Sequence, residues 1–149
     1  MKTHSALNDI NGYRFTDLKN TLGAVYIVRD PRKVVVSYAN HSQISLNESL
    51  NRLIELRTLG GQNDNQNQSV THVGSWSSNY LSWKEFEKVK KYLLIKYEDL
   101  ISDPEKYFLL ILEFIHKLSN TKFEVDKVKL KNVIETTTFE NLQNLEKKK

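Results

Sequence analysis

Arg29 and Ser37 have the residue types and the spacing to hold a phosphate, since they lie eight positions apart around a predicted strand–helix junction. The apolar run Ala24–Val28 predicts a buried strand that ends directly before Arg29. Asp30 and Pro31 are typical of an N-cap and a first helical residue, which predicts a helix from Pro31 onward. Ligands of parallel α/β sheets bind at the carboxyl ends of strands, and free N–H groups at a helix start favour an anion there. A guanidinium adds paired donors that match a phosphate.

Spacing alone leaves two alternatives open at this junction. In the first, Arg29 pairs with a carboxylate and Ser37 only fills space. In the second, the β-branched residues at 34–36 continue as a strand, although the pair Asp30 and Pro31 favours the helix.

The run VRDPRKVVVSY resembles the 3′-phosphate motif of cytosolic-type sulfotransferases, which move a sulfo group from the nucleotide donor PAPS to a hydroxyl or amine acceptor. In that motif an arginine and a serine eight positions later hold the 3′-phosphate of PAPS, and Arg29 and Ser37 have this spacing. Four further segments resemble the family in the same order: Lys2-Thr3-His4, Gly74-Ser75-Trp76 with Trp83, Lys96-Tyr97-Glu98-Asp99-Leu100 with Asp103-Pro104, and Thr136-Thr137-Thr138-Phe139-Glu140. Each segment is weak alone, but five in one order indicate the family from residue 2 to about residue 146.

The resemblance implies three nucleotide contacts besides the phosphate anchor. Tyr97 corresponds to a tyrosine near the adenine, and Thr137 and Phe139 correspond to residues that contact the adenine. For Tyr97 and Phe139 the alternative is plain packing in the core, as we expect for Trp76 and Trp83.

The resemblance also implies that His4 is the catalytic base and that Lys2 stabilises negative charge on the sulfo group or on the departing oxygen. An acceptor hydroxyl loses its proton as its oxygen attacks sulfur, and an imidazole, with an ordinary pKa of about 6.5, suits that task at neutral pH. The alternative for His4 is an exposed bystander near a chain end. His41 and His72 are competing bases without a positional argument.

The elements that position these residues alternate between strands and helices, which predicts an α/β domain with a parallel sheet. We expect one incomplete domain over 1–149, a partial three-layer fold of the P-loop/sulfotransferase type. A flexible polar loop is expected at 61–70, where the sequence is rich in Asn and Gln. The other expected elements are a helix over 47–59, a helix after Ser75, a buried strand over 92–97, a helix after Pro104, and shorter helices over 125–134 and 139–145.

One family element is expected but absent from the sequence: a Pro-Lys-Ser-Gly-Thr loop after the first strand, whose N–H groups cradle the 5′-phosphosulfate. The match starts at Lys2, so this strand and loop would precede Met1, and a later Arg-Lys-Gly loop would follow Lys149. Loss of one such donor costs about 100- to 1000-fold in rate, so we expect this polypeptide to be impaired or inactive. An exposed sheet edge would favour association with another chain.

Two alternative functions stay open. A non-catalytic fragment or paralogue would keep residual binding of adenosine 3′,5′-bisphosphate or a structural role. A P-loop phosphotransferase would need a G-x-x-x-x-G-K-[ST] loop, and none of the five glycines lies in one.

The composition limits the classes of partner. The 22 basic and 18 acidic residues give a net charge of +4, of which three charges are Lys147, Lys148 and Lys149, so we expect no nucleic-acid partner. The chain has no cysteine, which excludes disulfides and thiolate metal sites, and we expect no metal. No apolar run approaches the ~20 residues of a membrane helix, and no signal-like segment opens the chain, so we expect no membrane partner and a cytoplasmic location.

Overall fold

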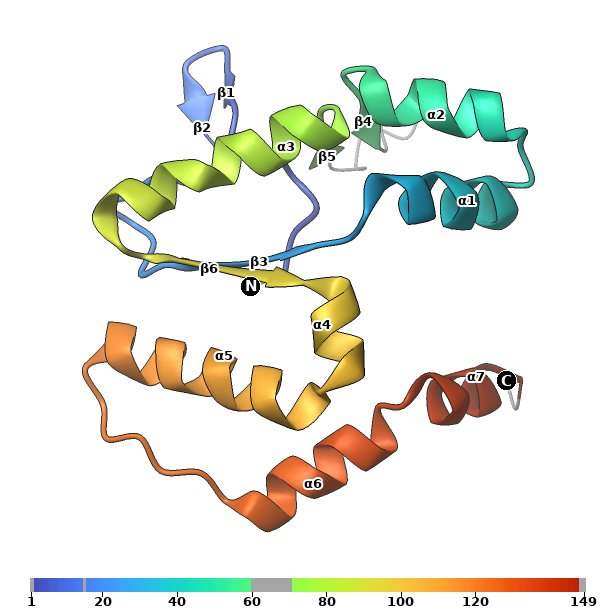
Figure 1. The fold of residues 1–149 in the computed structure, drawn as a ribbon. Coiled ribbons are helices and arrows are strands. Elements are labelled where there is room, and N and C mark those ends of the chain that lie inside the picture. The colour runs from blue at the N-terminus through green and yellow to red at the C-terminus, as the bar shows by residue number, and fades with distance from the viewer. Residues whose placement is uncertain (1, 15, 60–70, 148–149) are drawn as a thin grey trace. The chain divides into compact units, whose positions relative to one another are not determined.

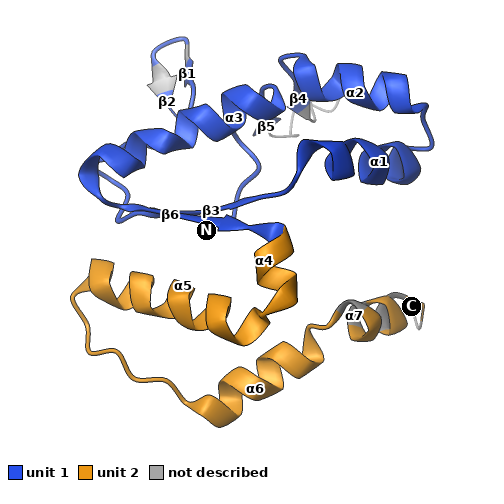
Figure 2. Ribbon diagram, in the orientation of Figure 1, with its two compact units in different colours: residues 1–97 blue, residues 98–149 orange. Residues whose placement is uncertain are grey.

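The structure is a computed structural model that describes residues 2–14, 16–59 and 71–147. It divides into two compact units, Met1–Tyr97 and Glu98–Lys149 (Figure 2). The single domain expected from the sequence stays a prediction, and the expected flexible loop at 61–70 lies outside the described residues. No helix in the described ranges is long and apolar enough to cross a membrane.

A parallel pair of strands forms the centre of the first unit. Strand β3 (Ala24–Val28) pairs in parallel with β6 (Tyr92–Lys96), in a register that places Val28 opposite Lys96. Both predicted strands are therefore confirmed, and so is the parallel sheet. The expectation of a fully buried strand is wrong for alternate residues of β3, since Val25 and Ile27 are exposed by 36% and 49%. Successive side chains point to opposite faces, and only the face that carries Ala24 and Tyr26 packs on the core.

In the described part of the first unit, four helical segments accompany these strands. Helix α3 packs on β3, and helices α1 and α2 lie side by side (Figure 1). The small core of this unit contains Leu7, Ala24, Trp83 and Phe86, and Phe86 is fully buried. The segments are α1 (Pro31–Ser42), α2 (Leu46–Ile54), α3 (Trp76–Trp83) and the 3-10 helix η1 (Lys84–Val89).

The predicted starts of these helices agree closely with the structure, whereas one predicted end does not. Asp30 caps α1 and Pro31 is its first residue, so the helix is confirmed over the alternative strand. The predicted helix over 47–59 is too long, because α2 ends at Ile54 and Glu55 is extended. Its last residues form a short strand, β4 (Thr58–Leu59), which pairs antiparallel with β5 (Thr71–His72). Periodicity did not reveal this change, nor the hairpin of β1 (Asp9–Ile10) and β2 (Tyr13–Arg14), because two-residue strands have too few residues to show a period.

The second unit is helical. Asp103 caps the long helix α5 through the N–H of Lys106, as its sequence predicts. The two shorter helices are also confirmed: the first lies two residues later than predicted, and the second starts at 139 as predicted and ends two residues later. The helices are α4 (Tyr97–Ser102), which begins with the last residue of the first unit, α5 (Pro104–Ser119), α6 (Lys127–Thr136) and α7 (Phe139–Lys147).

Candidate active site

The junction of β3 and α1 forms the first part of the candidate site. The Asp30 carboxylate accepts from the backbone N of Arg32 at 2.9 Å, and from Nε and Nη2 of the same residue at 3.0 and 2.6 Å. These bonds from Arg32 lower the pKa of Asp30 from 3.8 to about 2. The helix start is therefore fixed, and its one acidic side chain is already satisfied by a neighbouring cation.

Arg29 and Ser37 line one pocket at this junction, as their spacing predicts. The pocket lies along the first turns of α1, and its lining contains three cationic side chains. Its residues are Arg29, Asp30, Arg32, Lys33, Val36, Ser37 and Asn40. The Nε atom of Arg29 is buried and has no hydrogen-bond partner in the described residues. A buried N–H without a partner is costly, so an oxyanion in this pocket would supply the acceptor that Nε lacks.

Tyr97 lies against Arg29 because of the sheet register. Val28 is opposite Lys96, so the next residues of the two parallel strands, Arg29 and Tyr97, meet at the carboxyl edge of the sheet. The guanidinium carbon lies 4.9 Å from the centroid of the Tyr97 ring. The structure thus brings Arg29, Ser37 and Tyr97 together, although their motifs lie about 60 residues apart in the chain.

The segment that carries Lys2 and His4 is held through its backbone. Both side chains are exposed. The carbonyl of His4 accepts from Asn79 Nδ2 at 3.1 Å, and the carbonyl of Ser5 accepts from Trp83 Nε1 at 2.9 Å. The backbone N of Leu7 donates to Ser82 Oγ at 2.8 Å. Helix α3 therefore fixes the path of this segment and leaves the imidazole and the ammonium accessible.

Asn79 is a residue that the sequence reasoning missed. Its Nδ2 also donates to the carbonyl of Val73 at 2.7 Å, and its Oδ1 accepts from the hydroxyl of Tyr26 at 2.9 Å. One amide thus joins β3, the segment before α3 and the backbone of His4. The only sequence signal was a polar residue one turn before Trp83 on the inner face of α3, which also fits an exposed position.

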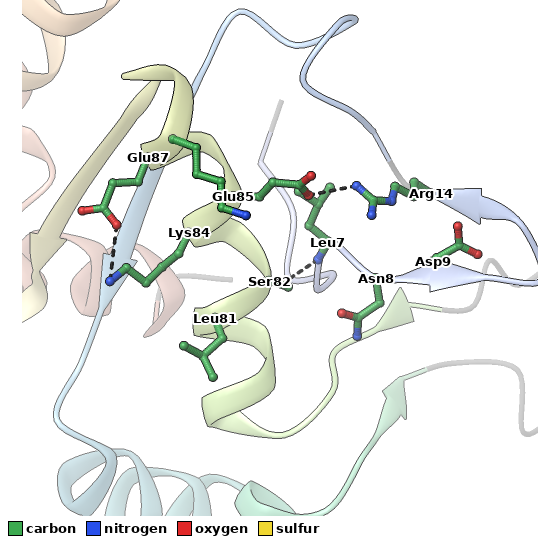
Figure 3. A pocket seen from close by; sticks show the side chains of 10 residues that line it. Leu7, Asn8, Asp9, Arg14, Leu81, Ser82, Lys84, Glu85 and Glu87 are labelled. Atoms are coloured by element: carbon green, nitrogen blue, oxygen red, sulfur yellow. Dashed lines mark hydrogen bonds and ion pairs between the residues drawn. The ribbon is translucent and has the colours of Figure 1, made fainter.

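A second pocket lies beyond Leu7, between the β1–β2 hairpin and the end of α3 (Figure 3). Its charges are largely paired. Arg14 binds Glu85 at 2.8 Å, and Lys84 binds Glu87 at 3.3 Å, as the dashed lines show. Charged side chains that already have partners offer little to a ligand. The ion pair of Arg14 and Glu85 instead ties the β1–β2 hairpin to η1.

Two expected adenine contacts lie in the second unit. Thr137 is the C-cap of α6, and its exposed Oγ1 donates to the carbonyl of Val133 at 2.7 Å. Phe139 is the first residue of α7, and its side chain lies outside the described part of the structure. Arg29 belongs to the first unit, so no contact within a single unit joins it to Thr137 or Phe139. The role of these two residues stays a prediction.

Comparison with known proteins identifies a family for this chain. The sulfotransferase domain family matches residues 2–149. The chain belongs to this family. The sulfotransferase domain is 30% identical over 124 residues to flavonol 3-sulfotransferase of Flaveria bidentis, a match that covers 82% of this chain and 38% of that relative. It superposes on the crystal structure of mouse sulfotransferase SULT7A1 complexed with PAP with a TM-score of 0.58, at 21% identity, over 80% of this chain and 39% of that one.

These matches also confirm the fold class. The sulfotransferase domain has an α/β architecture with a small parallel sheet and is a partial sulfotransferase fold. It spans about two fifths of the length of the relatives that it matches. In the described ranges, no group of three or more histidine or acidic side chains is placed to hold a metal ion.

Proposed function

We propose that this sulfotransferase domain binds PAPS at the β3–α1 junction and transfers its sulfo group to a hydroxyl or amine acceptor. The observation that carries the proposal is Arg29 itself, which lines a pocket together with Ser37 and whose buried Nε has no hydrogen-bond partner within the described ranges. A 3′-phosphate there would accept from Nε and from the Ser37 hydroxyl. The structural relative that is complexed with PAP supports a ligand of this class.

The proposed chemistry assigns a task to each remaining residue. PAPS, when bound, supplies a sulfo group that is activated by its bond to a phosphate. His4 accepts the proton of the acceptor hydroxyl, and its exposed ring on a fixed backbone suits that task. Lys2 stabilises negative charge that develops on the transferring group. Tyr97, Thr137 and Phe139 contact the adenine in this proposal.

Low turnover is expected of the 149-residue polypeptide itself. Its sequence has no Pro-Lys-Ser-Gly-Thr run, and the loss of such donors costs about 100- to 1000-fold in rate. Binding of adenosine 3′,5′-bisphosphate without turnover would favour the second candidate, a non-catalytic fragment or paralogue. A small-molecule acceptor, a cytoplasmic location and association through a sheet edge stay predictions. The same holds for the absence of a metal, a nucleic-acid partner and a membrane partner.

A calorimetric titration with adenosine 3′,5′-bisphosphate tests the anchor. The proposal predicts binding that Arg29→Ala weakens by about 10- to 100-fold, since hydrogen bonds to a charged group contribute about 1.5–3 kcal/mol. Arg14→Ala is the matched control, because Arg14 binds Glu85 away from this junction. The proposal is wrong if the wild type does not bind the nucleotide, or if the two variants weaken binding equally.

A further inference from the structure

Two arginine side chains gather on the hydroxyl of Tyr38. Arg57 Nη2 donates to this oxygen at 2.9 Å, and Arg52 Nη1 donates to it at 3.2 Å. The two guanidinium carbons lie 5.2 and 6.0 Å from the centroid of the Tyr38 ring. Tyr38 lies on α1 and Arg52 on α2, so the cluster joins the two neighbouring helices (Figure 1).

The cluster carries more positive than negative charge. Glu48 binds Arg52 Nη2 at 2.6 Å and compensates that side chain. The partners of Arg57 are neutral, namely the hydroxyl of Tyr38 and, at 3.5 Å, the carbonyl of Arg52. Within the described ranges no ion pair joins Arg57 to a carboxylate. All three residues of the cluster, Tyr38, Arg52 and Arg57, are partly exposed.

The ionisation of Tyr38 shows that this position favours a negative charge. The hydrogen bond from Arg52 is the largest cause, with the bond from Arg57 and one from Ser42, and together they lower the pKa of Tyr38 from 10.0 to about 8. Two guanidiniums that converge on a neutral phenol repel each other, and an oxyanion between them would relieve this repulsion.

The cluster is connected to the segment that carries the proposed base. The carbonyl of Arg57 accepts from the backbone N atoms of Val73 and Gly74 at 2.9 and 3.0 Å. The carbonyl of Val73 accepts from Asn79, whose amide also binds the carbonyl of His4. Arg57 is thus two hydrogen-bonded steps from the amide that holds the backbone of His4.

We propose that Arg52 and Arg57, gathered at Tyr38, bind an oxyanion group of the acceptor, such as a carboxylate or a sulfate. The identity of the ligand as an acceptor rests on the proposed function, whereas the binding of an oxyanion does not. Bidentate guanidinium donors match a planar or tetrahedral oxyanion, so the site selects an anionic acceptor over its neutral analogue.

Oxyanion binding can be measured at Tyr38 itself. Tyrosines labelled with 13C at Cζ are titrated with pH in sodium sulfate and in sodium chloride at equal ionic strength, with Tyr38→Phe to assign the signal. The Arg29→Gln background removes the proposed nucleotide anchor as a second sulfate site. We expect sulfate to raise the titration midpoint of Tyr38, because a bound oxyanion competes with the phenolate for both guanidiniums. Equal titration midpoints of Tyr38 in sulfate and in chloride would show that no oxyanion binds at this site, and this result would need no further variant.

Variants assign the effect to the arginines. In the same background, Arg57→Gln should weaken the sulfate response by about tenfold or more, while the control Arg14→Gln should keep it. A response that Arg57→Gln leaves unchanged would mean that Arg57 only packs α1 against α2. Arg57→Lys, which keeps the charge without the paired donors, should give an intermediate response.

A matched pair of probes separates an acceptor group from a free anion. Para-hydroxyphenylacetate and its methyl ester carry the same hydroxyl, but only the acid carries a carboxylate. We expect the acid to shift the titration midpoint of Tyr38 and the ester to leave this midpoint unchanged. If sulfate shifts the signal and the acid does not, the site takes only free oxyanions and the acceptor assignment is wrong. Failure of the nucleotide titration with a persisting sulfate response would instead refute the proposed function and leave the oxyanion site.

Discussion

The guanidinium of Arg29 lies over the ring of Tyr97, with its carbon 4.9 Å from the ring centroid. The two residues come from different motifs and meet because β3 and β6 are parallel and in a register that ends them at the same edge. The ring holds the guanidinium from one side, while Nε has no hydrogen-bond partner among the residues that the structure describes. If Arg29 binds the nucleotide as proposed, this contact orients the arginine before the anion binds, which lowers the cost of ordering on binding.

Tyr97→Leu should weaken the binding of adenosine 3′,5′-bisphosphate, whereas Tyr97→Phe should largely preserve the contact with Arg29. A cation–π contact contributes about 0.5–2 kcal/mol, which corresponds to about a 2- to 30-fold change in the dissociation constant. Calorimetric titration of the wild type and both variants measures this difference. Equal affinities of Tyr97→Leu and Tyr97→Phe would show that the ring does not orient Arg29.

Asn79→Ala should loosen the segment of His4 without unfolding the domain. The substitution removes the bonds to the carbonyls of His4 and Val73 and the acceptor for the hydroxyl of Tyr26. We expect a loss of about 1–3 kcal/mol of stability, because three polar groups, two of them in partly buried bonds, lose their hydrogen-bond partner. Hydrogen exchange should be faster at the Leu7 amide, which is bonded to α3, than in the wild type.

Asn47→Ala, at an exposed asparagine of α2, is the matched control for this experiment. It should leave both the stability and the exchange of the Leu7 amide unchanged. Unchanged exchange at Leu7 in Asn79→Ala would show that Trp83 and Ser82 hold the segment alone.

The sequence predicted the strand–helix junction that carries Arg29 and Ser37 because this junction is local. Arg29, its cap and Ser37 lie within one strand–helix junction, where N-cap and proline preferences determine the geometry. A few adjacent residues with strong conformational preferences mark such a junction, so a short stretch of sequence is enough to predict it. The contact of Tyr97 with Arg29 was not predicted, and it follows from the parallel register of β3 and β6.

The contacts of Asn79 and Tyr38 could not be predicted in the same way. The hydrogen bonds of Asn79 with His4 and Tyr26, and those of the arginine cluster with Tyr38, join residues 14 to 75 positions apart, and no local pattern marks such pairs. The helix over 47–59 was overextended for a related reason. Leu56 and Leu59 continue the apolar spacing, but the pairing of Thr58 with His72 decides their conformation.

Acid should remove the contribution of Asp30 to stability. Its pKa is lowered to about 2 in the folded state, so the contribution is fully present above 3.8 and is lost as the pH falls through about 2. Asp30→Asn keeps an N-capping side chain and lacks the charge. The difference in unfolding free energy between wild type and Asp30→Asn, measured in urea, should therefore narrow between pH 4 and pH 2.

Ser75→Ala is the control for the effect of pH, because Ser75 caps α3 with an uncharged hydroxyl and no acidic residue lies in the first turn of that helix. The loss of unfolding free energy caused by Ser75→Ala should stay nearly constant over the same pH range. A difference for Asp30→Asn that persists unchanged to pH 2 would mean that the carboxylate contributes through its shape and not through its charge.

Gly74→Ala should destabilise the domain more than Gly12→Ala. Both glycines have positive φ, +73° and +84°, so alanine at either position is strained by about 1 kcal/mol or more. At Gly74 an added Cβ would also lie 2.6 Å from Ser78 Oγ, whereas at Gly12 it would meet nothing within 4 Å. Ser78 Oγ accepts from the N of Ser75 and completes the capping box of α3, so its displacement frays the helix that holds His4. Thermal unfolding of the two variants isolates this steric effect, and equal melting temperatures would show that the Ser78 hydroxyl can rotate away without cost.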